Sequence, residues 1–181
     1  MSDTAFTRSD VDASLTRRPR PLDTILLGGL VIGILDGLFA LVFYGLILGV
    51  QPLRIFQPVA AGLLGSQAAI EGGVKTFLLG LLLHFIVATC IAAVYYLATL
   101  ILPFLIQHAV VCGLVYGMIA YMVMNYVVIP LSAIDVSNRT FNWRTVLPAF
   151  IGHAFLVGLP VALLARRSAQ ANQSASRNFS S

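Results

Sequence analysis

Residues 24–50 read TILLGGLVIGILDGLFALVFYGLILGV, and this stretch decides the fold class because Asp36 is its only charged residue. As an α-helix it would extend for about 40 Å, which exceeds the roughly 30 Å hydrocarbon core of a bilayer. It is also much longer than the apolar core of a secretory signal, about 7–15 residues, and no small-residue cleavage pattern closes it. We therefore predict a first membrane-spanning helix at residues 24–50.

Three further apolar stretches predict spanning helices at residues 75–101, 106–129 and 146–165. Pro103 and Pro130 mark the ends of the second and third, and Arg166 follows the fourth. Only a short connection separates the second helix from the third, so we expect these two to be antiparallel neighbours. The predicted fold class is an all-α integral membrane protein with four transmembrane helices.

The remaining segments are more polar or are interrupted by helix breakers. We predict disordered tails at residues 1–23 and 166–181, which are low in large apolar residues. Residues 51–74 contain Pro52, Pro58 and several glycines, and are too interrupted to span the bilayer. Both an interfacial helix and a re-entrant segment that lines a cavity fit this segment.

The composition and the placement of charge indicate a lipid bilayer as the main partner. Hydrophobic residues make up 59% of the chain and charged residues 10%, whereas a soluble domain carries about 25% charged residues. The arginines lie beside the ends of the apolar stretches and form no patch with interleaved aromatics, so we expect no nucleic-acid binding. The two tails hold seven basic residues and the other polar loops hold four, which predicts that both termini are cytoplasmic.

The sequence also suggests a duplicated two-helix hairpin. Residues 29–35, GLVIGIL, resemble residues 113–119, GLVYGMI, and the second and fourth helices each carry a histidine about two turns in, His84 and His153. Two hairpins in the same orientation would be related by an axis along the membrane normal. Chance similarity between Gly- and Leu-rich helices is the alternative.

Glycines at intervals of four residues predict close packing between helices. The predicted packing positions are Gly29, Gly33, Gly37, Gly113 and Gly117. Small residues let helix backbones approach closely in lipid, where the hydrophobic effect does not drive helices together. Such stripes also permit a homo-oligomer.

Each predicted helix contributes one polar residue to the membrane core: Asp36, His84, Asn125 and His153. An aspartate at the bilayer centre costs about 2.5–3.5 kcal/mol on insertion scales, so it should face the bundle and have a partner. Both histidines lie nine residues from the basic residue that precedes their helix, which places them about 13 Å deep. We therefore predict an intramembrane polar cluster.

Three interpretations of this cluster remain open. The first is a hydrogen-bond network that only fixes helix packing. The second is a pathway for protons or a small solute, and the third is a metal or bis-histidine haem site. The sequence carries no phosphate-binding loop, zinc-protease helix or nucleophile elbow. We accordingly predict no catalytic residue, no metal site and no cofactor, and expect that the protein is not an enzyme.

Several stretches resemble the YagU-like family of small bacterial inner-membrane proteins. They are Gly113-Leu114-Val115-Tyr116-Gly117 leading to Ile129-Pro130-Leu131, the run Phe150-Ile151-Gly152-His153, and the second helix around His84. The resemblance covers roughly residues 26–168. It implies a multi-pass protein of the bacterial cytoplasmic membrane with no established biochemical role and a link to acid tolerance.

Overall fold

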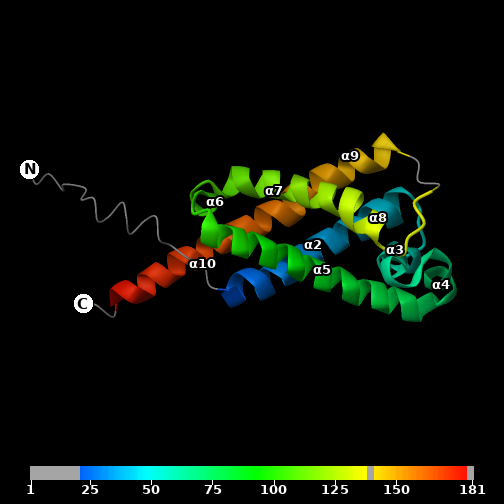
Figure 1. Cartoon of the computed structure of the whole chain (residues 1–181), viewed down its shortest axis with the longest axis horizontal. Helices are drawn as coiled ribbons and strands as arrows, with labels where there is room; N and C mark the ends of the chain where they lie inside the picture. Colours follow the sequence, from blue (N-terminus) through cyan, green and yellow to red (C-terminus); the bar gives the residue numbers. More distant parts are fainter. Residues whose placement is uncertain (1–20, 138–140, 179–181) are drawn as a thin grey trace, which may run out of the picture.

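The computed structural model describes residues 21–137 and 141–178, which are helical apart from short connections (Figure 1). Within them, four helical stretches are long and apolar enough to cross a membrane. They cover Asp23–Ile47, Gly73–Ile101, Ala109–Leu131 and Trp143–Ala171. The chain is therefore a multi-pass membrane protein, and the predicted all-α membrane fold is confirmed.

Three of the four spans combine α-helix with wider π-helical segments. The first span contains η1 (Asp23–Leu27), α2 (Gly28–Ala40) and η2 (Leu41–Ile47). The second is the single helix α5 (Gly73–Ile101). The third contains α7 (Ala109–Val123), η3 (Met124–Val128) and α8 (Ile129–Leu131). The fourth contains α9 (Trp143–Gly152), η4 (His153–Gly158) and α10 (Leu159–Asn178).

The two ends of the bundle differ in what joins the spans. The described chain begins and ends at the same end, which we call the terminal end, where α6 (Phe104–Gln107) also connects α5 to α7. At the opposite end, the loop end, lie α3 (Leu53–Leu64), α4 (Ser66–Glu71) and the connection before α9. Residues 132–137 run beside α3, because the Ala133 N–H donates to the Gly62 carbonyl at 3.0 Å.

The interrupted segment 51–74 forms two short helices that pack onto the bundle. Gly65, with φ +81°, separates α3 from α4 in a conformation that side-chain-bearing residues rarely adopt. A Cβ at Gly80 of α5 would overlap the Phe56 carbonyl of α3, so the two backbones are in direct contact. The segment thus covers the loop-end half of α5.

The fourth span ends later than predicted. We expected the helix to stop at Ala165 and residues 166–181 to be disordered, but α10 continues to Asn178. Residues 166–178 contain neither glycine nor proline, so nothing interrupts the helix. Ser168 is buried, and its hydroxyl lies 3.2 Å from the hydroxyl of Thr24, which is fully buried. The predicted N-terminal tail lies outside the described residues as far as residue 20.

The first two spans pack together through glycines of α2. A Cβ at Gly29 would lie 2.5 Å from the Thr89 hydroxyl, and one at Gly33 would lie 2.7 Å from the Phe85 ring. Both are closer than real Cβ contacts. A Cβ at Gly29 would also lie 2.6 Å from the Thr89 Cα and push α5 away, whereas one at Gly33 would displace the Phe85 ring. The two partners on α5, Thr89 and Phe85, lie five residues and one residue after His84.

The third and fourth spans pack in the same register. A Cβ at Gly113 would lie 2.8 Å from the Gly158 carbonyl, and one at Gly117 would lie 2.8 Å from the Ala154 Cα. The two partners, Gly158 and Ala154, again lie five residues and one residue after the histidine, here His153. The equal register supports the duplicated hairpin that the sequence suggests.

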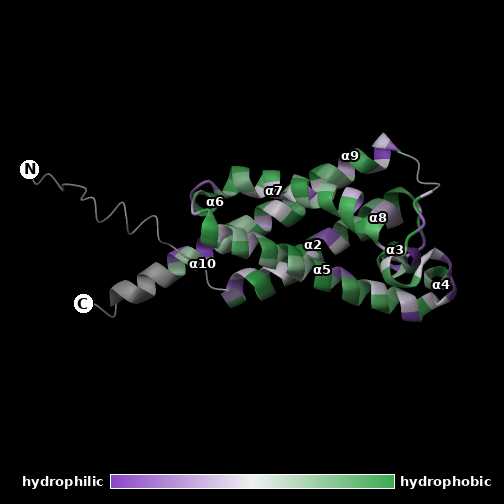
Figure 2. Ribbon diagram, in the orientation of Figure 1, coloured by the Kyte–Doolittle hydropathy of each residue, from purple (hydrophilic) through white to green (hydrophobic). Residues whose placement is uncertain are grey.

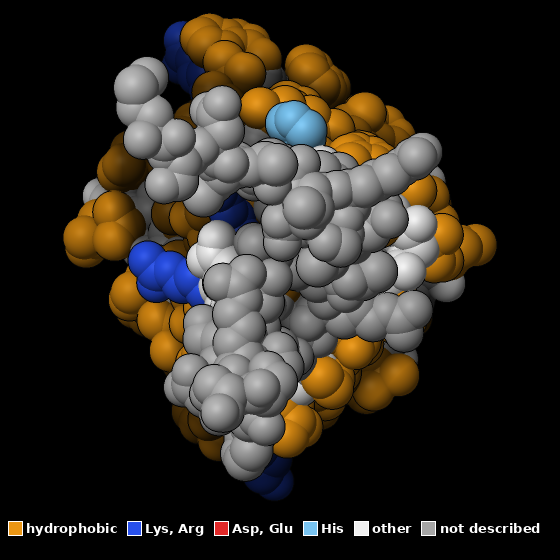
Figure 3. All heavy atoms as spheres, turned by 90° about the vertical axis from the view of Figure 1, so that its left-hand side faces the viewer, with side chains coloured by type: hydrophobic (Ala, Val, Ile, Leu, Met, Phe, Trp, Pro, Cys, Tyr) orange, Lys and Arg blue, Asp and Glu red, His pale blue; other side chains and the backbone are white. Residues whose placement is uncertain are grey.

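The core and the outer surface of the bundle are both apolar. The larger buried cluster fills the half of the bundle toward the terminal end and includes Ile32, Tyr95, Val157 and Val161. Figure 2 shows apolar residues along most of the four spans, with polar residues concentrated at the ends. Many large aliphatic side chains on the spans are exposed, which suits contact with lipid tails. Figure 3 views the molecule from the terminal end. It shows hydrophobic side chains around the circumference, together with a few Lys and Arg side chains.

Candidate functional site

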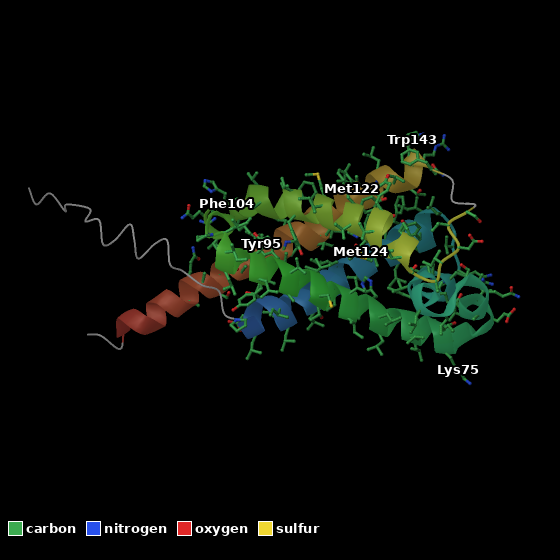
Figure 4. The ribbon with its side chains drawn as sticks, viewed as in Figure 1. Lys75, Tyr95, Phe104, Met122, Met124 and Trp143 are labelled. Atoms are coloured by element: carbon green, nitrogen blue, oxygen red, sulfur yellow. The ribbon has the colours of Figure 1, made fainter. Side chains whose placement is uncertain are left out.

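The main candidate site is a cavity of about 180 Å³ inside the bundle, between all four spans and α3. Three of its lining residues are titratable and the others are apolar. The lining residues are Ile32, Asp36, Val59, His84, Val87, Ala88, Ile91, Met124, His153 and Val157. Figure 4 places Met124 on the side of its helix that faces α5 and Met122 on the opposite side. We call this space the polar cavity.

Asp36 and His153 face each other across the polar cavity. The Asp36 Oδ1 lies 3.7 Å from the His153 Nδ1, and their side chains are 20% and 19% exposed. The same nitrogen lies 3.0 Å from the Ala149 carbonyl. A carbonyl oxygen only accepts, so Nδ1 carries the ring proton and donates to Ala149. The Nε2 of His153 is then the ring nitrogen that can accept a further proton.

His84 is held against the first span by its other ring nitrogen. Its Nε2 lies 2.9 Å from the Gly33 carbonyl, so this nitrogen carries the proton and donates. The Phe56 and Phe85 rings pack edge-on against the imidazole, with centroids 5.3 and 5.6 Å away. Gly37 lies beside the ring, with the His84 Nε2 at 3.5 Å from the position that a Cβ would take. The Nδ1 of His84 is left as the nitrogen that can gain a proton.

The position of His153 depends on a close approach between α7 and η4. A Cβ at Gly117 would overlap the His153 carbonyl, so only glycine lets the two backbones meet there. The Tyr121 ring packs edge-on against the imidazole at 5.2 Å. The π-helical segment η4 begins at His153, and π-helical turns inside α-helices are frequent at functional sites.

Asn125, the fourth predicted member of the cluster, does not line the polar cavity. Its side-chain Nδ2 donates to the Tyr121 carbonyl at 2.9 Å, one turn earlier on the same span. Met124, the preceding residue, contributes to the lining instead. The structure thus brings three of the four predicted residues to one cavity and leaves Asn125 beside it.

No protein-family model, curated protein or solved structure matches the chain.

The polar cavity has an apolar floor toward the terminal end. Ile32, Ala88 and Val157 line the cavity and also belong to the buried cluster that fills that half of the bundle. Beyond them, the Tyr116 hydroxyl donates to the Ile91 carbonyl at 2.6 Å and links α7 to α5. The cavity is closed on this side in the conformation described.

The two imidazole rings of the polar cavity are each anchored through one ring nitrogen. Across residues 21–137 and 141–178, no group of three or more His, Cys, Asp and Glu side chains is placed to hold a metal ion. Each imidazole already donates one ring N–H to a backbone carbonyl and keeps one nitrogen for a proton. The Asp36 Oδ1 lies 3.7 Å from the His153 Nδ1.

The sequence left open whether residues 51–74 line a cavity, and it did not identify the residues of α3 that do. Phe56 packs on His84, and Val59 lines the polar cavity. The signal was present in the spacing of Phe56, Val59 and Ala60, which puts apolar residues on one face of a helix. The π-helical segments left no comparable signal in the sequence.

Proposed function

We propose that this membrane protein moves protons across the bilayer through the polar cavity, with Asp36 and His153 as the groups that exchange them. The observation that carries the proposal is the placement of Asp36, His84 and His153 around one cavity among four spanning helices. Ionisable residues inside transmembrane segments are costly and usually mark ion or proton pathways.

The chemistry needs groups that gain and lose protons reversibly at short range. Imidazole does this most readily near neutral pH. A proton taken up at the His153 Nε2 lies on a ring whose Nδ1 is 3.7 Å from the Asp36 Oδ1. His84 offers a second basic nitrogen on the same cavity.

The apolar floor implies that transport needs a second conformation. In the conformation described, Ile32, Ala88 and Val157 separate the polar cavity from the terminal end. Protons that reach Asp36 can continue only when this contact opens. A small solute that travels with the proton would occupy the cavity in the same step.

The test is proton flux into liposomes that contain the purified protein and a trapped pH-sensitive dye, with valinomycin and potassium to cancel the membrane potential. Wild-type protein should acidify the lumen faster than protein-free liposomes after an external acid pulse. Asp36→Asn should reduce the rate to the protein-free level. Asp135→Asn removes a carboxylate from an exposed loop and should leave the rate unchanged.

Both variants must retain helix content by circular dichroism and elute as the wild type does on size exclusion. Equal flux in wild type and Asp36→Asn would refute the proposal. Failure of wild-type protein to raise the flux at any pH between 4 and 8 would refute it as well.

A structural role is the second candidate, and one contact favours it. The His84 Nε2–H donates across helices to the Gly33 carbonyl and ties α5 to α2. If the cluster only fixes packing, His84→Leu should lower the melting temperature while Asp36→Asn leaves proton flux at the wild-type level.

We also propose that the terminal end faces the cytoplasm of a bacterial cell and that the protein supports acid tolerance. The excess of basic residues in the terminal segments supports the orientation, and the resemblance to the YagU-like family supports the setting. Survival of cells at low pH with wild-type or Asp36→Asn protein tests the physiological role. Equal survival would contradict it.

A further inference from the structure

The lining of the polar cavity restricts what can occupy it besides protons. Its lining residues, all within the described part of the chain, include no lysine, arginine, hydroxyl or amide side chain. Apart from Asp36, His84 and His153, the walls consist of aliphatic side chains and the thioether of Met124. An anion would find no fixed cation there. The lining therefore favours an occupant that is apolar over most of its surface.

The carboxyl group of Asp36 lacks a hydrogen-bond donor. Among the residues that the structure describes, its ion-pair partner is His153, whose Nδ1 lies 3.7 Å from the Asp36 Oδ1, beyond hydrogen-bond distance. That nitrogen donates its proton to the Ala149 carbonyl instead. The Asp36 side chain is 20% exposed and lines the polar cavity, so an occupant can reach it. The carboxyl group is thus open to a donor from outside the chain.

The two imidazoles cannot donate to an occupant while they are neutral. The His84 Nε2–H donates to the Gly33 carbonyl at 2.9 Å, and the His153 Nδ1–H donates to the Ala149 carbonyl at 3.0 Å. A neutral imidazole has a single N–H, so the other nitrogen of each ring only accepts. Apart from a proton that Asp36 itself can hold, the side chains of the cavity have no donor to spare. An occupant that forms hydrogen bonds must bring its own N–H or O–H.

A charge in the membrane core persists only beside an opposite charge. Asp36 can meet this condition in two ways, because its carboxyl group either holds a proton or pairs with a cation in the cavity. An alkylammonium group suits the second state, since it combines a positive charge with three N–H donors. Its binding to the protonated carboxyl group yields a carboxylate–ammonium pair and releases one proton to water. Proton and ammonium therefore compete for one carboxyl group.

The volume of the cavity limits the hydrocarbon part of the occupant. An apolar cavity of about 150 Å³ holds one benzene molecule, and the polar cavity has a volume of about 180 Å³. A ring or chain of six carbons with one amino group therefore fits.

We propose that the polar cavity binds a small lipophilic primary amine in its ammonium form, which pairs with Asp36 in place of a proton. The hydrocarbon part contacts the aliphatic walls, which include Ile32, Ala88 and Val157. This inference rests on the proposed function, because it assigns the solute that shares the cavity with the proton. It implies that the protein exchanges protons for such cations.

The surroundings of Asp36 fix the direction of the pH dependence. Besides the two histidines, Tyr44 of η2 interacts electrostatically with Asp36 and with Tyr121 of α7, and α3 contributes the apolar Val59 to the lining. Tyrosine and alkylammonium groups keep their protons below about pH 9. Lowering the pH from 8 to 5 can thus protonate only Asp36 or the histidines, and each of these changes weakens the binding of a cation.

The test is equilibrium dialysis of radiolabelled cyclohexylamine against the purified protein in detergent at pH 8, with protein-free detergent as the blank. Cyclohexanol has the same ring without the charge, so wild-type protein should bind it at least tenfold more weakly. Asp36→Asn should weaken cyclohexylamine binding at least tenfold while it keeps the helix content and elution volume of the wild type. At pH 5 the wild type should bind the amine more weakly than at pH 8.

Two methionines supply a matched pair of variants for the location of the site. Met124 lines the polar cavity and faces α5, whereas Met122 lies on the opposite side of the helix (Figure 4). Met124→Trp should fill part of the cavity and weaken the binding of cyclohexylamine, and Met122→Trp should leave it unchanged. An equal loss in both variants would contradict binding in the cavity.

Three further results would overturn the inference. They are equal binding of amine and alcohol to the wild type, equal amine binding by wild type and Asp36→Asn, and equal amine binding at pH 5 and pH 8. Failure of the proposed function is distinguishable from failure of this inference. Proton flux without amine binding would refute this inference alone, whereas amine binding without proton flux would uphold the site and refute the proposed function.

Discussion

Replacing Gly117 by alanine tests how closely α7 and η4 pack beside the polar cavity. The added Cβ would overlap the His153 carbonyl and lie 2.8 Å from the Ala154 Cα. Both obstacles are backbone atoms, so no side-chain rotation relieves the overlap. The two helices must separate, and His153 moves with η4.

The expected loss of stability follows from two opposing terms. Overpacking of this kind costs about 1–3 kcal/mol, and alanine regains up to about 1 kcal/mol of helix propensity over glycine. The net loss should be about 1–2 kcal/mol. For a domain of 150–250 residues, 1 kcal/mol shifts the melting temperature by about 2–4 °C, so we expect a fall of about 3–6 °C.

The assay is thermal unfolding of the purified protein in one detergent, followed by circular dichroism. Gly37→Ala is the matched control: its Cβ would have its nearest neighbour, the His84 Nε2, at an ordinary contact distance of 3.5 Å. We expect the melting temperature of this variant to stay level or to rise slightly. If Gly117→Ala is as stable as Gly37→Ala, the close approach of α7 and η4 is wrong.

Two further predictions concern single hydrogen bonds. Tyr116→Phe removes the hydrogen bond to the Ile91 carbonyl and should lower the free energy of unfolding by about 0.5–1.5 kcal/mol. An unchanged melting temperature would argue against this link between α7 and α5. Asn142→Ala removes the side-chain cap that accepts the Arg144 N–H at 3.0 Å, at a cost of about 1 kcal/mol. Hydrogen exchange at the first turn of α9 should then quicken while exchange in α5 stays constant, and equal exchange with and without the cap would contradict its role.

The positions of the spans along the membrane normal could be predicted because helix length and depth follow from counting residues. The depth argument placed Asp36, His84 and His153 at related levels, and the structure places them on one cavity. Rotation about the helix axis could not be predicted in the same way. Glycines such as Gly29 and Gly117 mark the packing face, but they do not tell which flanking side chains enter the cavity, and Asn125 lies beside it.

The ends of the helices show a second limit of the sequence. Arg166 predicts the end of the fourth span, although a charged residue ends only the part of a helix that lies in lipid. The helix itself continues to Asn178 as long as its backbone hydrogen bonds are uninterrupted. The sequence could not decide between an interfacial and a cavity-lining segment at residues 51–74 for a different reason. The packing of α3 on α5 depends on Gly80, whose importance appears only when Phe56 is placed against it.

The central claim is that a titratable carboxyl group lines a cavity within the membrane core. Its most direct test is modification of Asp36 by the lipophilic reagent dicyclohexylcarbodiimide, which reacts with protonated carboxyl groups, in protein reconstituted in liposomes and analysed by peptide mass spectrometry. We expect Asp36 to be modified faster as the pH falls, whereas a water-soluble carbodiimide modifies the exposed Asp135 and spares Asp36. Modification of Asp36 by the water-soluble reagent at the rate of Asp135, or no modification by the lipophilic reagent at any pH, would contradict the claim.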